Sequence, residues 1–112
     1  MLRRWNQRLV AVLMAALVSS SALAQPELGD CVKGKALAET LCSGCHNVWM
    51  GPVDRDKNEI PSFYDFANRP DQTPELLVAG IILPHPLMPK VPFTNEELRN
   101  IVAYIMSLRT QD

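Results

Sequence analysis

The chain has 112 residues, with 11 basic and 12 acidic side chains and a formal net charge of −1 at pH 7. Without its first 24 residues, which hold three arginines and no acid, it has eight basic against twelve acidic side chains, a net charge of −4. This excludes the basic surface that displaces counterions from phosphates, so we expect no nucleic-acid partner. The 88 residues that follow the leader suffice for one small domain.

Residues 1–24 have the three parts of a secretory signal peptide. A segment with three arginines precedes an apolar run at residues 9–18, and small residues follow up to Ala24. The apolar run has ten residues, whereas a membrane-spanning helix needs about 20. We therefore predict cleavage after Ala24, export to the periplasm and no retained membrane span, with one domain at residues 25–112.

The first predicted helix of the mature chain has Asp30 as its N-cap and runs through Leu41. Gly34 lies inside it, although glycine in a helix costs about 1 kcal/mol relative to alanine. Its presence indicates that another backbone approaches closely at this point. Leu37 and Leu41, four residues apart, are expected to form the buried stripe.

Directly after this helix come Cys42 and Cys45, three positions apart, with His46 immediately behind the second thiol. This C-x-x-C-H spacing is typical of c-type haem attachment, with two thioethers and a histidine that reaches the iron. The alternatives are a dithiol redox couple, expected near a βαβ pattern, and half of a zinc site. Neither context is visible, since no second C-x-x-C follows and the other histidine, His85, lies far downstream.

Cys31 is left over when the motif has used two of the three cysteines. An odd cysteine in an exported protein is either a free thiol or the site of an intermolecular disulfide. We expect a packed or partly exposed thiol without an assigned role, and a Cys31-linked dimer is the alternative.

Two further short helices are expected after a loop at residues 47–61. The first has Ser62 as its cap and extends through Asn68. The second begins at Thr73, has proline in its first helical position, and runs to about Ile82.

Residues 84–92 contain four prolines and are predicted to form a rigid loop without regular structure. The last helix follows, with Thr94 and Glu97 as a capping box. We expect it to pack against the first helix, with Tyr104 near Gly34. Its apolar positions recur with helical spacing: Leu98, Ile101, Val102, Ile105 and Leu108.

A haem iron bound by His46 needs a sixth ligand or an open site, and four side chains compete for it. Met50 is too close to His46 in the chain, and Met106 belongs to a patterned helix where a long apolar side chain is usually core. His85 would give bis-histidine ligation, or else is structural or exposed. Met88, on the proline-rich loop with Pro89 behind it, is the preferred ligand because it lies far enough along the chain to wrap the haem. A histidine–methionine pair raises the haem potential and closes the iron to exogenous ligands, as an electron carrier requires.

The pattern resembles a small class I cytochrome c over nearly all the mature chain. The resemblance implies an all-α fold of three to four short helices around one covalent haem c, with the first and last helices crossing. It also implies a proline carbonyl that accepts the ring N–H of His46, for which Pro61 is preferred over Pro52. The matching positions are Gly29, Asp30, Gly34, residues 42–46, Met88, Pro89 and the closing helix with Tyr104.

The resemblance further implies one-electron transfer rather than enzyme activity, with other redox proteins docking transiently at an exposed haem edge. The alternatives are a cytochrome subunit of a larger oxidoreductase and a haem module whose displaceable sixth ligand allows gas binding or small-molecule redox chemistry. Trp49, Tyr64 and Arg69 carry donors suited to haem propionates, although packing or exposure is an equally good explanation for each.

Overall fold

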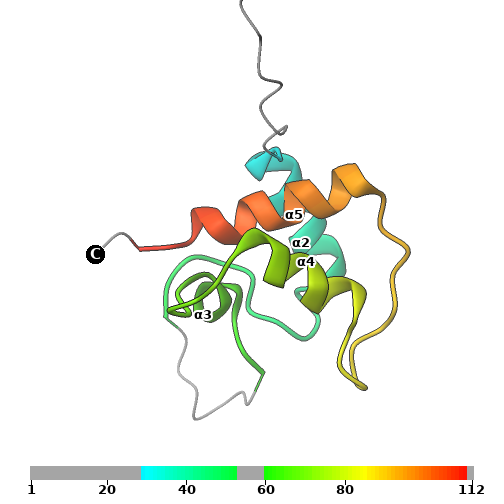
Figure 1. Ribbon diagram of the computed structural model, residues 1–112, viewed down its shortest axis with the longest axis horizontal. Helices are drawn as coiled ribbons and strands as arrows, with labels where there is room; N and C mark the ends of the chain where they lie inside the picture. Colours follow the sequence, from blue (N-terminus) through cyan, green and yellow to red (C-terminus); the bar gives the residue numbers. More distant parts are fainter. Residues whose placement is uncertain (1–28, 53–59, 111–112) are drawn as a thin grey trace, which may run out of the picture.

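The computed structural model describes residues 29–52 and 60–110, so the expected signal peptide and its cleavage site lie outside the described residues. Within these two ranges the chain forms helices and no strand, which confirms the all-α prediction (Figure 1). None of these helices is both long and apolar enough to cross a membrane. The elements are α2 (Cys31–Leu41), α3 (Phe63–Ala67), α4 (Pro74–Ile82) and α5 (Asn95–Ser107).

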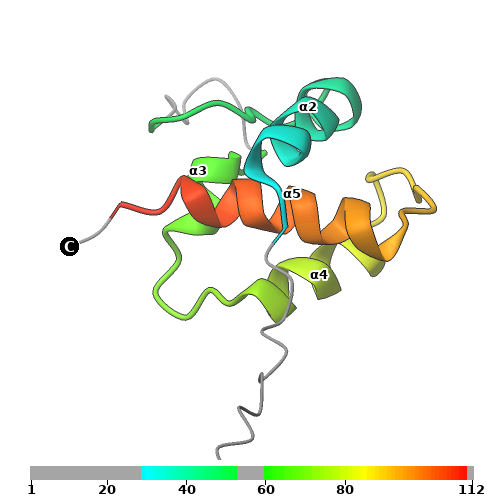
Figure 2. The ribbon, with the colours of Figure 1, turned by 90° about the horizontal axis from the view of Figure 1, so that it is seen from above.

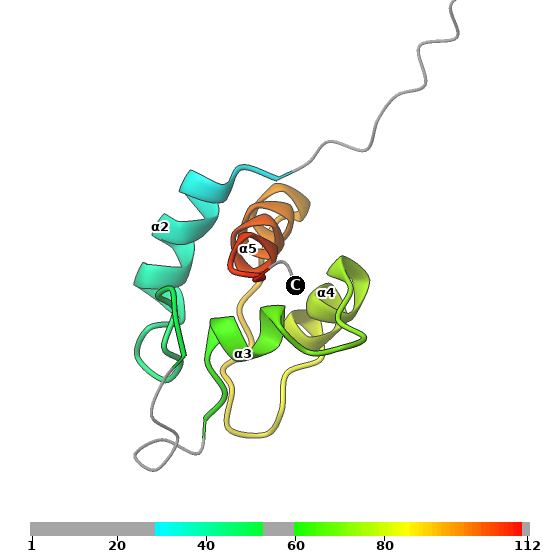
Figure 3. The same ribbon diagram turned by 90° about the vertical axis from the view of Figure 1, so that its left-hand side faces the viewer.

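Helix α5 is the central element. Helix α2 packs across one side of it and α4 lies on the opposite side, while α3 lies beneath α5, between the other two helices in Figure 3 (Figures 2 and 3). The first and last described helices therefore cross, as expected. Helix α5 and its C-cap supply half of the buried hydrophobic core, and the other half is Ala38, Val48, Phe63, Ala67 and Leu77.

The crossing of α2 and α5 is centred on Gly34. A Cβ at this position would lie 2.5 Å from the carbonyl carbon of Asn100, closer still to its oxygen, and 2.9 Å from the Cβ of Tyr104. Real Cβ atoms essentially never approach other atoms within 3.0 Å. Glycine is thus required here because the backbone of α5 occupies the space of a side chain, which confirms the close approach inferred from the sequence.

A buried asparagine joins the start of α2 to α5. The Oδ1 of Asn100 accepts a hydrogen bond of 2.7 Å from the backbone N–H of Asp30, and Asn100 is 5% exposed. The Asp30 carboxylate in turn accepts from the backbone N–H groups of Val32 and Lys33. The helix cap is therefore held in place by the partner helix as well as by its own turn.

The predicted leucine stripe of α2 is wrong for Leu41 and holds only in part for Leu37, which packs against the edge of the core. Leu41 is 45% exposed and Leu37 is half-buried, whereas the buried positions of α2 are Gly34 and Ala38. The two small residues, four apart, let α5 approach closely, so the contact face passes through them. The larger leucines are displaced to the margin of that face.

The other caps agree with the sequence. Ser62 forms a capping box with Asp65, Thr73 accepts from the third residue of α4, and Thr94 forms its box with Glu97. Residues 84–92 contain no helix or strand, as their prolines predict.

Two side chains of the C-terminal region hold loop segments in place through hydrogen bonds to backbone carbonyls. The buried hydroxyl of Tyr104 donates to the carbonyl of Val48 at 2.6 Å. The Arg109 guanidinium donates to the carbonyls of Ala67, Arg69 and Gln72 at 3.1–3.3 Å. Helix α5 and its continuation therefore position both the segment after the C-x-x-C-H motif and the connection from α3 to α4.

Candidate functional site

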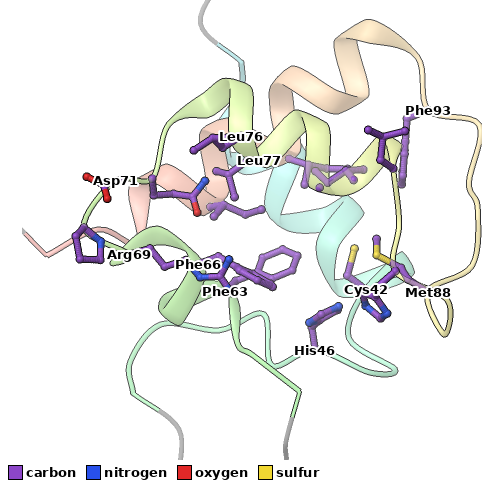
Figure 4. A pocket seen from close by; sticks show the side chains of 18 residues that line it. Cys42, His46, Phe63, Phe66, Arg69, Asp71, Leu76, Leu77, Met88 and Phe93 are labelled. Carbon is purple, nitrogen blue, oxygen red and sulfur yellow. The ribbon is translucent and has the colours of Figure 1, made fainter.

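A cavity of about 630 Å³ lies between the motif, the three later helices and the proline-rich loop. Its volume falls in the range of about 300–1,000 Å³ that is typical of ligand and cofactor sites. Figure 4 shows aromatic and aliphatic side chains projecting into it. Its apolar wall includes Phe63, Phe66, Leu77, Phe93, Ile101 and Ile105.

His46 lies at this cavity with its ring fixed by a backbone contact. Its Nδ1 is 2.8 Å from the carbonyl oxygen of Pro61, which confirms Pro61 over Pro52. Because a carbonyl only accepts hydrogen bonds, Nδ1 is the nitrogen that carries the hydrogen, and in the neutral ring Nε2 is then the nitrogen with the free lone pair. The rings of Phe63 and Phe66, with centroids 5.9 and 5.7 Å from that of His46, surround the imidazole. This is the orientation by a second contact that metal-binding histidines require.

The motif closes as a tight turn at the end of α2. The backbone N–H groups of Cys45 and His46 both donate to the carbonyl of Cys42, at 3.2 and 2.9 Å. Cys42 is half-buried and lines the cavity, whereas Cys45 is exposed. The turn therefore brings the first thiol and the imidazole to one cavity, with the second thiol beside them in the chain.

The dithiol and zinc interpretations find no support in this geometry. Burial raises the pKa of the Cys42 thiol, whereas reactive C-x-x-C couples lower the pKa of the attacking thiol. Among the described residues, no three side chains of the His, Cys, Asp or Glu types gather as metal ligands.

The proline-rich loop brings two candidate ligands to the same cavity. Met88 is half-buried and His85 is exposed, and both line the cavity wall. Figure 4 shows Met88 near Cys42 and His46 at one end of the site. Met50 is 80% exposed and Met106 packs against the core, so neither lines the cavity.

Polar groups gather at the other end of the cavity, where Figure 4 shows Arg69 and Asp71. The Arg69 guanidinium carbon lies 4.6 Å from the centroid of the Phe66 ring, in cation–π geometry. Of the three donors considered for propionates, Arg69 alone lines the cavity, since Trp49 donates to Glu39 instead and Tyr64 lies outside it. Gln72, a buried residue at the same end, carries no sequence signal and was missed.

The donor set fits a covalently attached haem. The Cys42 thiol and an oriented imidazole line an apolar cavity that also presents a thioether, and the second thiol, Cys45, follows in the same turn. These are the attachment groups and axial ligand types of c-type haem. Haem binding through these residues would also fill the apolar space with a large apolar group, which a domain of this size needs for stability.

Comparison with known proteins gives a relative of similar length. The chain is 42% identical over 98 residues to Cytochrome c-552 of Bradyrhizobium diazoefficiens, and the alignment covers 88% of this chain and 89% of that protein. No family model matches the chain. No solved structure matches it either.

Proposed function

From the premise that the chain belongs to the small c-type cytochromes, covalent haem c proteins that carry electrons, we propose that it is a periplasmic one-electron carrier. In this proposal Cys42 and Cys45 hold the haem as thioethers, and His46 and Met88 are its axial ligands. The observation that carries the proposal is the His46 imidazole, held by Pro61 next to the cavity that Met88 also lines.

Haem c supplies a one-electron centre when bound, because its iron alternates between the ferric and ferrous states. The residues of this chain bind it, orient it and exclude water. The contact between His46 Nδ1 and the Pro61 carbonyl fixes the tautomer and the direction of the ring, so the iron-facing nitrogen is set before the ligand bond forms. An axial ligand that is already oriented needs little rearrangement on a change of charge.

The apolar wall of the cavity excludes water from the haem site. Phe63, Ile101 and Ile105 are each at most 5% exposed and line the cavity, so water is kept from that side of the site. Low polarity and methionine ligation both favour the reduced state of a haem and raise its potential. Arg69, at the polar end, is the residue that we assign to a haem propionate.

The proposed ligation is tested on purified holoprotein. Ferric wild-type protein should show the weak red absorption band of thioether-ligated haem, and the ferrous protein should not bind carbon monoxide readily. Met88→Ala should abolish the band, while Leu87→Ala, an exposed neighbour on the same loop, should leave it unchanged. Retention of the band in Met88→Ala would place the thioether ligand elsewhere. Rapid binding of carbon monoxide by the wild-type protein would favour a gas-binding module instead.

Periplasmic location follows in this proposal from the predicted signal peptide, whose residues lie outside the described part of the chain. Fractionation of cells should release the haem protein with the periplasm, and mass spectrometry should find a mature chain that begins at Gln25. A protein retained in the membrane fraction with its leader uncut would contradict this.

The partners that we propose are other redox proteins, which dock transiently at the haem edge.

Cys31 allows either a free thiol or a disulfide-linked dimer. It is exposed, and its thiol donates at 3.4 Å to the carbonyl of Ala103. Non-reducing electrophoresis of wild-type and Cys31→Ser protein distinguishes the two forms. We expect monomers in both samples, with Cys31 as a free thiol, and a dimer in the wild type alone would show the disulfide instead.

A further inference from the structure

The proline-rich loop places a second imidazole at the site beside the proposed methionine ligand. The backbone N–H of Met88 donates to the carbonyl of His85 at 2.9 Å, which closes a β-turn with Pro86 in its second position. Proline fixes one backbone angle of this turn, so His85 and Met88 are held at its two ends. Both side chains line the cavity that contains His46.

The spacing of the two imidazoles fits a shared metal. The ring centroids of His46 and His85 are 6.5 Å apart, with an interplanar angle of 73°. A metal bound to two imidazoles on its opposite sides, with metal–nitrogen bonds of about 2 Å, separates their ring centroids by about 6 Å. His85 therefore lies at the distance from His46 at which one iron can bind both rings.

The chemistry of the two loop residues differs in a way that permits exchange. The Met88 thioether is a soft ligand that favours the reduced iron, whereas an imidazole is a good ligand for both iron states. Met88 is half-buried and His85 is exposed at the cavity rim. Of the described lining residues, His46 and His85 are those with an imidazole, and Lys90 on the same loop does not line the cavity.

We propose that His85 is a reserve axial ligand, which binds the haem iron when Met88 leaves it. This rests on the proposed ligation by His46 and Met88. In the exchange one iron–sulfur bond breaks and one iron–nitrogen bond forms, the neutral imidazole donates its lone pair, and no electron is gained or lost. The two ligands share one four-residue turn, so a small movement of that turn exchanges them.

The test compares ferric holoproteins by visible absorption and electron paramagnetic resonance. Met88→Ala should lose the weak red band but remain low-spin, with the resonance signature of two imidazole ligands. Met88→Ala combined with His85→Ala should be high-spin, and its ferrous form should bind carbon monoxide at least tenfold faster than that of Met88→Ala. His85→Ala alone should keep the red band of the wild type.

The outcomes separate this proposal from the one on which it rests. A high-spin Met88→Ala protein would overturn the reserve ligand and leave Met88 as the normal ligand. A red band that persists in Met88→Ala would instead overturn the ligation by Met88. A double variant that stays low-spin would assign the exchange to a residue other than His85 and would also overturn the proposal.

A second measurement covers the case in which Met88→Ala does not mature. Ferric wild-type and His85→Ala proteins are warmed below their cooperative unfolding, which is followed by circular dichroism. As the red band fades reversibly, the wild type should stay low-spin while His85→Ala becomes high-spin. Identical spin states in the two proteins throughout this range would refute the proposal.

Discussion

Gly34→Ala should destabilise the protein because it forces α2 and α5 apart. The new Cβ would lie 2.5 Å from the Asn100 carbonyl carbon and closer to its oxygen, against the 3.0 Å limit that Cβ atoms observe. The obstacle is backbone, which cannot rotate away as a side chain does. Overpacking of a core costs about 1–3 kcal/mol, and we expect the upper end of this range.

Alanine has the better helix propensity, which returns about 1 kcal/mol. The net loss in the free energy of unfolding is therefore about 2 kcal/mol, which lowers the Tm of a domain of this size by about 8–16 °C. Thermal unfolding of the ferric holoprotein, followed by circular dichroism, measures this. Val32→Ala, on the exposed side of α2, is the control and should leave the Tm unchanged or slightly higher. If Gly34→Ala matched this control, the crossing would not be as tight as the structure has it.

Other variants test the contacts that fasten the loops. Tyr104→Phe removes the hydroxyl that donates to the buried Val48 carbonyl, and should cost about 1–3 kcal/mol in urea unfolding. Burial of the hydroxyl, with a smaller contribution from the Glu39 charge, raises the pKa of Tyr104. Its protonated form is thus favoured by folding, so this stabilisation holds below the ordinary tyrosine value of about 10 and is lost as pH rises through the folded pKa. The alkaline loss of stability should be shallower in Tyr104→Phe, and equal slopes would contradict this assignment. Arg109→Leu should speed amide hydrogen exchange in the α3–α4 connection and leave that of α2 unchanged, because three carbonyls there lose their donor. Thr94→Ala should lower the free energy of unfolding by about 1 kcal/mol through loss of its capping box, and an unchanged value would remove that box as a stabilising feature.

Helix boundaries were predictable from the sequence because capping is a local interaction. Asp30, Ser62, Thr73 and Thr94 each bind backbone N–H groups two or three residues ahead, so their positions define where helices begin. The C-x-x-C-H motif was equally local. These features need no knowledge of what packs against them.

The face of α2 was not predictable from its own residues. Leucine periodicity pointed to Leu37 and Leu41, but the contact depends on the backbone of Asn100, 66 residues beyond Gly34 in the chain. Gly34 indicated that another backbone approaches closely, but the sequence did not show which residues of the partner helix would be in contact. Helix propensity and hydrophobicity can be judged from one segment, whereas the face on which two helices meet depends on the residues of both.

At the site, too, residue types were predictable and their spatial relations were not. The sequence left Pro52 and Pro61 as candidates for the carbonyl that contacts His46, and the structure identifies Pro61 by its distance from Nδ1. The sequence nominated Met88 and His85 from their residue types, and their shared turn is local, but the placement of that turn beside His46 depends on a contact across 39 residues. Gln72 has no periodicity or motif to mark it, so its burial appears only in the structure.

Helix α5 serves two surfaces at once. Asn100 and Tyr104 meet α2, while Ile101 and Ile105, each one position further along, form part of the cavity wall. A larger residue at position 34 would push α5 away from α2 and so change the lining of the cavity on its other face. In relatives with a larger residue at position 34, we therefore expect side chains of different volume at positions 101 and 105. The helix contact and the environment of the haem would then change together in evolution.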